Sequence, residues 1–475
     1  MKMDRSSGNV SLPIRIAWGC GGWADNWMLG VISYLFLYVY VDFFHMDPVL
    51  AGVVLCVPRV FDAISDLYVG IFSDNLRCRW GRRRPLIVIG TVGCAALLPM
   101  FFWPPFSETI HNPWYSNGPF WFLSLVTTLY YAVFYTLFIV PYTALGYELG
   151  GEYDERTKVL AWRMYLGLAG QMMVPWVYKL SVNKTYFHNI QQGAIAVSLA
   201  AAAAILILGC MPAVFCKENP DNQKHPQASF LVALKTSFSC IPFRYIIVGL
   251  LIITCFYCAT SSLNGFVSLY VVCRGDNALN SHIVGWVGTI TSITSVLSLL
   301  LTIHISRKID KKNALIICLA IMGFAQLSSF ITLTPKHPYW QLYTAFLTGI
   351  SMQGCWLMFD SMLSDVCDIE ELRVGRRSEG IFSSVRGFIQ KLSGGAMVLF
   401  SGYLLKFSGF DAEIAQTQGL GEDVLGTMKF LSIIIPLVGT ISCMILFLFY
   451  PVSRAKVEEV HHILNAAHDS KLSTD

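Results

Sequence analysis

Charged side chains are scarce in this sequence. Only 13% of its 475 residues are Asp, Glu, Lys or Arg, about half the share that soluble globular domains carry. In contrast, 55% are hydrophobic, and apolar runs near the roughly 20 residues that span a bilayer as a helix recur along the whole chain. A soluble enzyme of this length needs a hydrophilic surface that these residues do not supply. The sequence therefore predicts an all-α protein that crosses a membrane many times.

Catalytic and cofactor motifs are also missing. The sequence has no nucleophile–histidine–acid set, no phosphate-cradling glycine loop and no HExxH zinc motif. Most of its 14 cysteines lie inside apolar runs, where they pack as small apolar side chains, so we expect neither disulfides nor a structural metal. Its basic residues cluster beside the apolar runs, which argues against nucleic-acid binding. We expect neither an enzyme nor a cofactor-binding protein.

Twelve apolar runs are long enough to be transmembrane helices. The sixth and seventh are separated by a polar, proline-containing segment, 217–240, which we predict to be a cytoplasmic loop between two six-helix halves, 1–216 and 241–450. Residues 451–475 then form a cytoplasmic tail. The predicted spans are 14–44, 47–72, 85–105, 117–148, 158–182, 190–216, 241–272, 281–305, 313–333, 338–366, 378–406 and 428–450.

The basic residues indicate the orientation in the membrane. With the N-terminus inside the cell, most of the 34 lysines and arginines fall in cytoplasmic segments, and an even number of spans places both termini there. The loop after the second span, Ser73–Pro85, is strongly basic, and the loop after the eighth, Ser306–Lys312, repeats this feature in the second half. Twelve spans in two such halves resemble the major facilitator architecture.

Ionisable side chains inside a span are costly, which makes each one a candidate functional group. Arg59, Asp62 and Asp66 fall on one face of the second span. Two carboxylates one turn apart need a cation between them or a proton on one of them. With the hydroxyls of Ser65 and Thr136, this oxygen-only ligand set suits Na⁺, Li⁺ or a proton. We expect a coupling-cation site, with Na⁺ at Asp62 and Asp66; the alternative is an Arg59–Asp62 ion pair that only holds helices together.

Other polar side chains in the spans form a candidate substrate site. Aromatic, carboxylate and amide groups in the first span provide a platform for a polyhydroxylated ligand. Lys391 needs an acidic partner, and the aspartates of the second span are the obvious ones. Arg386 either binds an oxyanion of the substrate or pairs with Asp360 and leaves a neutral pocket. The candidate substrate-binding residues are Trp23, Asp25, Asn26, Tyr142, Arg163, Trp356, Asp360, Arg386, Gln390 and Lys391.

A second group of charges lies near the predicted cytoplasmic ends of spans ten and eleven. Asp365 and Asp368 precede Arg373, Arg376 and Arg377. Acids and arginines at a helix end are typical of salt bridges that open and close with a conformational change. We expect Asp365, Asp368 and Glu379, with the basic cytoplasmic loops, to form an inward gate, and Arg59 to take part in a salt bridge.

The segment from Arg59 to Asp66, followed by Arg79-Trp-Gly-Arg-Arg-Arg-Pro85, resembles the glycoside–pentoside–hexuronide:cation symporter family, to which melibiose permease belongs. The resemblance implies a major facilitator fold, alternating access and symport of a sugar with Na⁺, Li⁺ or H⁺. It also implies that Asp62, Ser65, Asp66 and Thr136 are the cation site, that Lys391 links this site to the sugar, and that Arg163 and Trp356 contact the sugar. It continues through Tyr135-Thr136, Pro141-Tyr142, Arg163, Asn264-Gly265, Trp356, Asp365-x-x-Asp368, Glu379 and Lys391-x-x-Gly394, which is nearly the whole chain.

The chain differs from melibiose permease at the positions that bind the galactosyl group of the sugar in that protein. Asp25-Asn26 stands in place of Lys-Asp, Ile139 in place of Asp, Thr143 in place of Trp, and Arg386-Gly387 in place of Gln-Thr. We therefore expect a neutral or acidic glycoside other than melibiose, carried by a monomer among the lipids of a prokaryotic inner membrane. The alternatives are a lysophospholipid carrier of the same architecture and a non-transporting receptor, which the short predicted tails disfavour.

Overall fold

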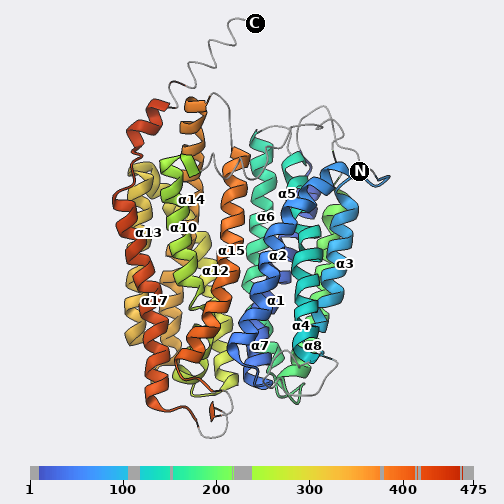
Figure 1. The fold of residues 1–475 in the computed structure, drawn as a ribbon, viewed down its shortest axis with the longest axis vertical. Helices are drawn as coiled ribbons and strands as arrows, with labels where there is room; N and C mark the ends of the chain where they lie inside the picture. Colours follow the sequence, from blue (N-terminus) through green and yellow to red (C-terminus); the bar gives the residue numbers. More distant parts are fainter. Residues whose placement is uncertain are drawn as a thin grey trace, which may run out of the picture.

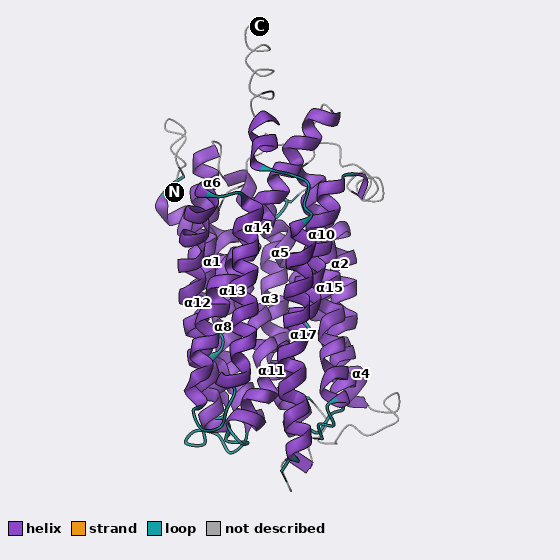
Figure 2. Ribbon diagram, turned by 90° about the vertical axis from the view of Figure 1, so that its left-hand side faces the viewer, coloured by secondary structure: helices purple, strands orange, loops and turns teal. Residues whose placement is uncertain are grey.

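A computed structural model describes the chain over residues 10–76, 78–104, 118–149, 153–216, 218, 238–374, 379–411, 414–415, 419–460 and 463. The regular structure in these residues is helical, with no strand among them (Figure 2). The helical segments join into twelve rods that lie side by side along the long axis of the molecule (Figure 1). The predicted all-α fold is therefore confirmed, and each predicted span falls on one rod.

The first six rods lie on one side of the bundle in Figure 1. Several are composite, because a π-helical or broken stretch interrupts the α-helix. In chain order they are α1 (Leu12–Leu37) with η1 (Tyr38–Phe43), α2 (Pro48–Asn75), α3 (Arg84–Met100), α4 (Gly118–Thr128) with η3 (Leu129–Tyr135) and α5 (Thr136–Leu149), α6 (Tyr153–Met173) with α7 (Trp176–Ser181), and α8 (Ile190–Phe215).

The last six rods lie on the other side. The tenth rod is longer than predicted, since it continues past residue 366 to Val374. In chain order they are α10 (Ile241–Cys258) with α11 (Ser261–Phe266) and η4 (Val267–Val272), α12 (Asn277–Lys308), α13 (Lys311–Thr332), α14 (Gln341–Val374) after the short 3₁₀ helix η5 (Pro338–Trp340), α15 (Glu379–Phe407), and α17 (Glu422–Leu448).

Aspartate caps fix where three of these helices begin. The Asp47 carboxylate accepts a hydrogen bond from the backbone N–H of Val49 at 2.8 Å, and Pro48 occupies the first turn of α2, where no N–H is needed. Asp276 and Asp310 cap α12 and α13 in the same way. Each cap accepts hydrogen bonds from the first backbone N–H groups of its helix, which have no partner within the helix. The capped residue therefore marks where the helix begins.

The same turn follows the first and the seventh rods. Each rod ends in a π-helical segment, η1 or η4, and then passes through a residue in the left-handed region, His45 at φ 54° or Arg274 at φ 51°. The next helix starts two residues later, at the caps Asp47 and Asp276. This repetition fits two pseudo-symmetric halves. The boundary that we predict between them, 217–240, lies almost wholly outside the described residues, so that division stays a prediction.

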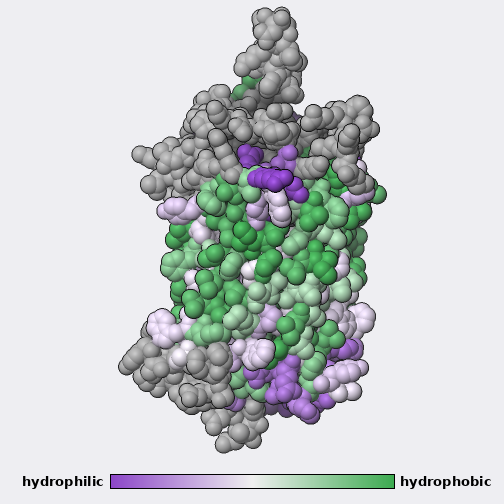
Figure 3. All heavy atoms as spheres, turned by 90° about the vertical axis from the view of Figure 1, so that its right-hand side faces the viewer, coloured by the Kyte–Doolittle hydropathy of each residue, from purple (hydrophilic) through white to green (hydrophobic). Residues whose placement is uncertain are grey.

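The surface of the bundle is suited to a membrane. Figure 3 shows apolar side chains in a belt around the middle, with hydrophilic side chains toward the two ends. Among the described residues, nine rods are long and apolar enough to cross a membrane; α3 is shorter, and the rods of α6 and α14 are also outside this group. The chain is an integral membrane protein of many spans, and spanning by those three rods remains the expectation from the sequence.

Several polar contacts join the two halves at the end of the bundle remote from the first and last described residues. There the Tyr270 hydroxyl donates a hydrogen bond to the buried Asp42 carboxylate, and the Tyr178 hydroxyl donates to Asn277 Oδ1 at 2.8 Å. The Lys406 ammonium contacts Asp47 at 2.6 Å at the same end. These contacts tie the first, second and fifth rods to the seventh, eighth and eleventh.

At the opposite end, a single carboxylate holds the basic loop between α2 and α3. Glu218 accepts hydrogen bonds from the backbone N–H groups of Arg82, Arg83 and Arg84 at 2.9, 2.8 and 3.1 Å. Gly81 has a φ of 104°, and a Cβ there would lie 2.6 Å from Glu218 Oε1, so the close approach requires glycine. Glu218 thereby caps the N-terminus of α3 and fastens the loop to the end of the sixth rod.

We expect Glu218→Gln to lower the apparent melting temperature by about 2–4 °C, because three charge-assisted hydrogen bonds become weaker neutral ones, a loss of about 1–2 kcal/mol. Thermal unfolding in detergent, followed by helical circular dichroism, measures the effect. Glu422→Gln is the matched control. Glu422 is 84% exposed, and its ion pair with Arg274 is long, at 3.9 Å, so this pair contributes little to stability. Equal melting temperatures for Glu218→Gln and the unmodified protein would contradict this role.

Candidate transport site

The second rod carries three charges at mid-depth, and its own sequence makes this stretch irregular. Pro58 lies inside α2 and has no N–H to donate, so the helical hydrogen bond that its N–H would make is missing one turn before Asp62. Asp62 and Thr136 are fully buried. A buried carboxylate must be matched by donors or cations, and the residues around Asp62 supply both.

Hydroxyl groups from two rods surround Asp62. Thr136 donates to Asp62 Oδ1 at 2.8 Å and lies 3.0 Å from the Ser65 hydroxyl, which also contacts the Asp62 carbonyl oxygen at 3.0 Å. Thr136 directly follows the π-helical segment η3, and its hydroxyl also reaches the Tyr131 carbonyl five residues back. Such π-helical stretches are frequent at functional sites. The structure thus brings together Asp62, Ser65 and Thr136 as the sequence predicts, while cation binding itself stays a prediction.

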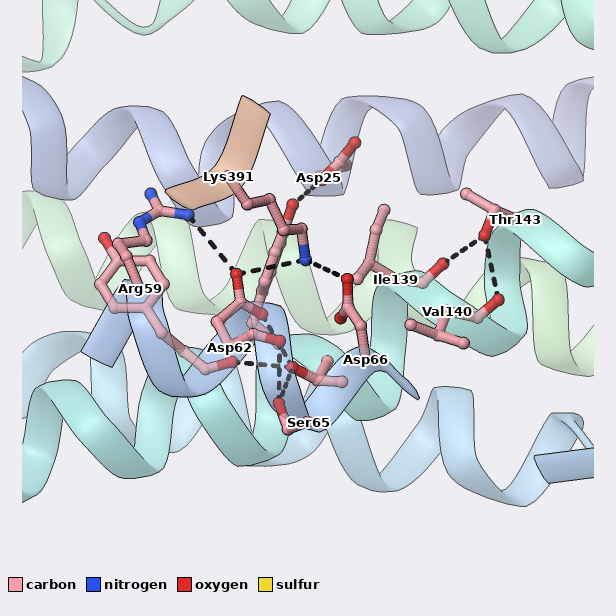
Figure 4. A network of polar contacts seen from close by, with 12 residues as sticks. Asp25, Arg59, Asp62, Ser65, Asp66, Ile139, Val140, Thr143 and Lys391 are labelled. Carbon is pink, nitrogen blue, oxygen red and sulfur yellow. Dashed lines mark hydrogen bonds and ion pairs between the residues drawn. The ribbon is translucent and has the colours of Figure 1, made fainter. Parts of the chain in front are cut away.

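Lys391 enters this group from the other half of the protein. Its ammonium lies 2.5 Å from Asp66 Oδ2 and 3.2 Å from Asp62 Oδ2, so one cation bridges both carboxylates (Figure 4). About a quarter of each side chain, 27% for Lys391 and 26% for Asp66, is accessible, whereas Asp62 is completely enclosed. The acidic partners that we expected for Lys391 are therefore the ones it has.

Arg59 approaches the same carboxylate from the side. Its guanidinium lies 4.0 Å from Asp62 Oδ2, and its carbon Cζ lies 4.0 Å above the centre of the Tyr131 ring. A guanidinium over an aromatic face is stabilised by the ring quadrupole. Arg59 thus forms the ion pair with Asp62 that the sequence leaves open for it.

A second ion pair lies within the first half. Arg163 Nη2 contacts Asp25 Oδ2 at 3.3 Å, and the Tyr135 hydroxyl donates to Asp25 Oδ1 at 2.9 Å. The backbones of α1 and α6 approach closely enough for this pair because α1 has glycine there: a Cβ at Gly22 would lie 2.7 Å from the Arg163 carbonyl oxygen. Tyr142 lies behind the pair, fully buried, with its hydroxyl bonded to the Trp18 carbonyl.

A third ion pair lies within the second half. Arg386 Nη2 contacts Asp360 Oδ1 at 2.7 Å, while 53% of the Asp360 side chain remains exposed. Of the two roles that the sequence left open for Arg386, the structure shows the pairing with Asp360. Trp356, one turn before Asp360 on α14, and Gln390, one turn after Arg386 on α15, are both half-buried.

Two buried donors near these pairs have no hydrogen-bond partner among the described residues: Trp23 Nε1 from the first half and Arg386 Nε from the second. The Asn26 amide, in contrast, donates to the Gly22 carbonyl at 2.9 Å on its own helix. The Thr143 hydroxyl bonds to the Ile139 and Val140 carbonyls, so the fourth rod presents no acid or free hydroxyl there (Figure 4). That the chain does not bind a galactosyl group stays a prediction from the sequence.

One of the residues predicted to form a gate, Asp365, has a partner on another helix. Asp365 is buried and binds the Lys311 ammonium at 2.6 Å, from the start of α13. The sequence places it near Arg373, Arg376 and Arg377; Arg376 and Arg377 lie outside the described residues, as do the side chains of Arg373 and Glu379, so that part stays a prediction. Asp368 lies one turn further along α14 and is half-buried.

Sequence reasoning missed Lys311 and Tyr135 as partners of site residues. Tyr135 stands beside Thr136 in the sequence, yet no periodicity shows that its hydroxyl reaches α1. Lys311 belongs to a basic loop that the sequence explains by membrane topology alone. Both become visible only once the rods are packed.

Charges at the centre of the bundle balance one another. Each of four carboxylates lies within ion-pair distance of at least one of four cations, in one cluster and two separate pairs, so with every group ionised these eight side chains carry no net charge. They are Asp25, Asp62, Asp66 and Asp360 on one side, and Arg59, Arg163, Arg386 and Lys391 on the other.

Comparisons with known proteins fit this geometry. Residues 17–454 match the family described as "MFS/sugar transport protein" of the major facilitator superfamily. The chain belongs to this family. The family includes melibiose permease-like symporters, and its members are transporters, not enzymes; for this member the match establishes a small-molecule substrate and a membrane environment.

Two relatives of this chain are named for different solutes. The chain is 25% identical to the putative glycoside/cation symporter YagG of Escherichia coli, over 95% of this chain and 94% of that one. It is 27% identical to the sphingosine-1-phosphate transporter MFSD2B of Mus musculus, over 93% of this chain and 89% of that one. A solved bacterial homologue of the human lysosomal transporter Spinster superposes with a TM-score of 0.69 at 13% identity, covering 92% and 97% of the two chains, which supports the fold alone.

Proposed function

We propose that this protein is a secondary transporter that couples the movement of a sugar or glycoside to that of Na⁺ or H⁺. The observation that carries the proposal is the bridge from Lys391 to Asp62 and Asp66. It joins the two halves at mid-depth, where a major facilitator protein holds its cargo. Ionisable groups at such a depth are retained for ion or proton movement.

The coupling ion competes with Lys391 for the same carboxylates. In the structure the ammonium lies between Asp62 and Asp66, which keeps two acids ionised without an added cation. When substrate draws Lys391 away, the two carboxylates, together with the Ser65 and Thr136 hydroxyls, become free to accept Na⁺, Li⁺ or a proton. Substrate and ion then each favour binding of the other by the same factor.

The balanced ion pairs favour an uncharged glycoside as the substrate. Arg163 and Arg386 already have carboxylate partners, and the two free donors, Trp23 Nε1 and Arg386 Nε, suit the hydroxyl oxygens of a sugar. An acidic sugar has to compete with Asp360 for Arg386. Since Asp360 is half exposed, this competition is possible and can be measured.

The access state follows if the termini are cytoplasmic, as the basic loops indicate. The halves are then joined at the outer end by the pairs Asp42–Tyr270 and Asp47–Lys406. We propose that this arrangement is the inward-facing state of a monomer in a prokaryotic inner membrane. The Lys311–Asp365 pair lies at the inner end and is a candidate inner gate.

Transport of a lysophospholipid is a second candidate. A pocket of about 470 Å³ opens on the side of the bundle between α2, α4 and α15, with walls that include Val53, Val57 and Trp121. Its walls are mostly apolar, so it suits an acyl chain, and one relative carries the name of a sphingosine-1-phosphate transporter. The free donors in the centre favour the sugar over this alternative.

Uptake into liposomes distinguishes these functions. Purified protein is tested with a panel of neutral and acidic glycosides, and with lysophosphatidylcholine, under imposed Na⁺ or H⁺ gradients. Gradient-driven accumulation of any glycoside supports the proposal. Accumulation of the lipid alone would move the function to the second candidate.

Removing the acid beside Arg386 is expected to change preference between neutral and acidic sugars. In Asp360→Asn the guanidinium loses its carboxylate partner, so uptake of a glucuronide should rise relative to the matching glucoside by about tenfold, the value of one charge-assisted hydrogen bond. Counterflow of the two labelled sugars gives the ratio. The double variant Asp360→Asn/Arg386→Gln should return the ratio toward its original value, and an unchanged ratio in Asp360→Asn would refute this use of Arg386.

A further inference from the structure

A second pocket lies far from the transport site, at the end of the bundle that carries residues 454–460. It has a volume of about 290 Å³ and lies between the α12–α13 turn, α14 and the segment that follows α17. One water takes up roughly 30 Å³ in the liquid, so about ten would fit. Its lining includes four cationic side chains, Arg307, Lys311, Lys312 and Arg454, and three carboxylates, Asp310, Asp365 and Glu458.

A buried hydroxyl in the wall of this pocket has no partner. Tyr450 is only 6% exposed, and among the described residues its hydroxyl makes no hydrogen bond. Buried polar groups in proteins are almost always paired, so a group of this kind needs an explanation. A bound molecule with an acceptor oxygen in the pocket would provide the missing partner.

The cations of this lining outnumber its carboxylates by one, and two of the cations are held by bonds to carbonyl oxygens. Lys312 Nζ donates to the Leu448 carbonyl at 2.7 Å, and Arg454 Nη1 donates to the Arg307 carbonyl at 3.1 Å. Neither bond neutralises a charge. Among the described residues, Arg307 and Lys312 have no carboxylate within ion-pair distance, whereas Lys311 is paired with Asp365 and Arg454 with Glu458.

We propose that this pocket binds a phosphate group, with Arg307, Lys312 and Arg454 holding its oxygens and the Tyr450 hydroxyl donating to one of them. Arginine and lysine in fixed positions with one hydroxyl donor are the partners that phosphate requires. The volume exceeds the needs of a bare oxyanion, and apolar wall residues such as Met362 and Val457 lie beside the cations, so the phosphorylated headgroup of a membrane lipid is the source that fits best.

Occupancy of this pocket would act on the candidate gate. Lys311 lines the pocket and also binds Asp365 at 2.6 Å. A phosphate near Lys311 competes with Asp365 for the same ammonium and weakens the link between α13 and α14. The site itself does not depend on which solute the protein carries, so it is tested by binding and not by transport.

The experiment uses the full chain in nanodiscs of phosphatidylcholine. One arm titrates dioctanoyl phosphatidylinositol 4-phosphate, and the other titrates inorganic phosphate, with the dissociation constant measured by isothermal calorimetry. We expect saturable binding of the lipid, about tenfold weaker in Tyr450→Phe and about 100-fold weaker in the double variant Arg307→Gln/Arg454→Gln, since each lost charge-assisted bond changes affinity about tenfold. Saturable binding in both arms shows that the phosphate group suffices, and binding in the lipid arm alone assigns the source to the membrane.

Controls keep the test decisive. Tyr450→Phe removes only a hydroxyl that bonds to nothing, so its melting temperature should not fall. Lys308→Gln removes a neighbouring cation that does not line the pocket, and we expect its affinity to stay within about twofold, since charge at a distance is screened. No saturable binding in either arm, unchanged affinity in Tyr450→Phe, or equal weakening by Lys308→Gln would each overturn the proposal.

Discussion

Asp62→Asn is expected to reduce cation-driven uptake by about 100-fold or more while the helical bundle remains folded. Asp62 is fully buried. It accepts a hydrogen bond from Thr136 and forms ion pairs with Lys391 and Arg59. Removing one partner of a buried ionic group costs about 3–5 kcal/mol, because the remaining charges lose their compensation. An amide of the same shape keeps the Thr136 contact but cannot hold a monovalent cation with the strength of a carboxylate.

Asp66→Asn should produce the same loss of coupling with a smaller effect on stability, because Asp66 is partly accessible and has fewer partners. Uptake of the substrate identified by the liposome panel, with and without an ion gradient, measures both variants. Asp423→Asn, at an exposed position at the start of α17, is the matched control and should behave as the unmodified protein. Full gradient-driven accumulation by either site variant would remove Asp62 and Asp66 from the cation site.

Part of this site could be predicted from the sequence because local geometry determines it. Arg59, Asp62 and Asp66 are spaced so that any α-helix places them on one face, and the structure shows them there. The partner of Lys391 could be predicted for another reason. A buried ammonium requires an acid, and the second span offers two acids at a suitable depth.

Other contacts depend on packing that the sequence pattern does not describe. Asp25 is held by Arg163 and Tyr135, which come from two further rods and meet it only because glycines allow α1 to lie close to α6. Asp365 binds the ammonium of Lys311, which lies at the start of another helix, α13. The sequence pattern does not show which helix ends meet, so this ion pair could not be predicted from it.

The fold was predictable for a simpler reason. Apolar runs of spanning length have one stable form in a bilayer, the helix, because it satisfies its own backbone hydrogen bonds. The π-helical segments η1, η3 and η4 lie inside such runs and leave the apolar pattern unchanged. They could not be predicted, although one of them places Thr136 against Asp62.

Lys391→Gln is the second change with a large expected effect, and it separates two steps of transport. Without the ammonium, Asp62 and Asp66 need a cation or a proton at all times. We therefore expect the affinity for the coupling ion to rise at least tenfold, in line with the loss of one charge-assisted competitor. The empty carrier loses its internal substitute for the ion, so its return across the membrane becomes slow and net accumulation falls by about 100-fold.

Substrate exchange should continue in Lys391→Gln. During exchange the carrier reorients in both directions with substrate and ion bound, so the step of the empty carrier is not needed. Counterflow of labelled substrate, with ion and substrate on both sides, is expected to continue at a measurable rate while net uptake is lost. Lys336→Gln is the control for loss of a lysine charge away from the site, because Lys336 lies at an exposed position between α13 and η5. Loss of counterflow together with net uptake would mean that Lys391 is needed for substrate binding itself, and normal accumulation by Lys391→Gln would show that the bridge to Asp62 and Asp66 has no part in the return step.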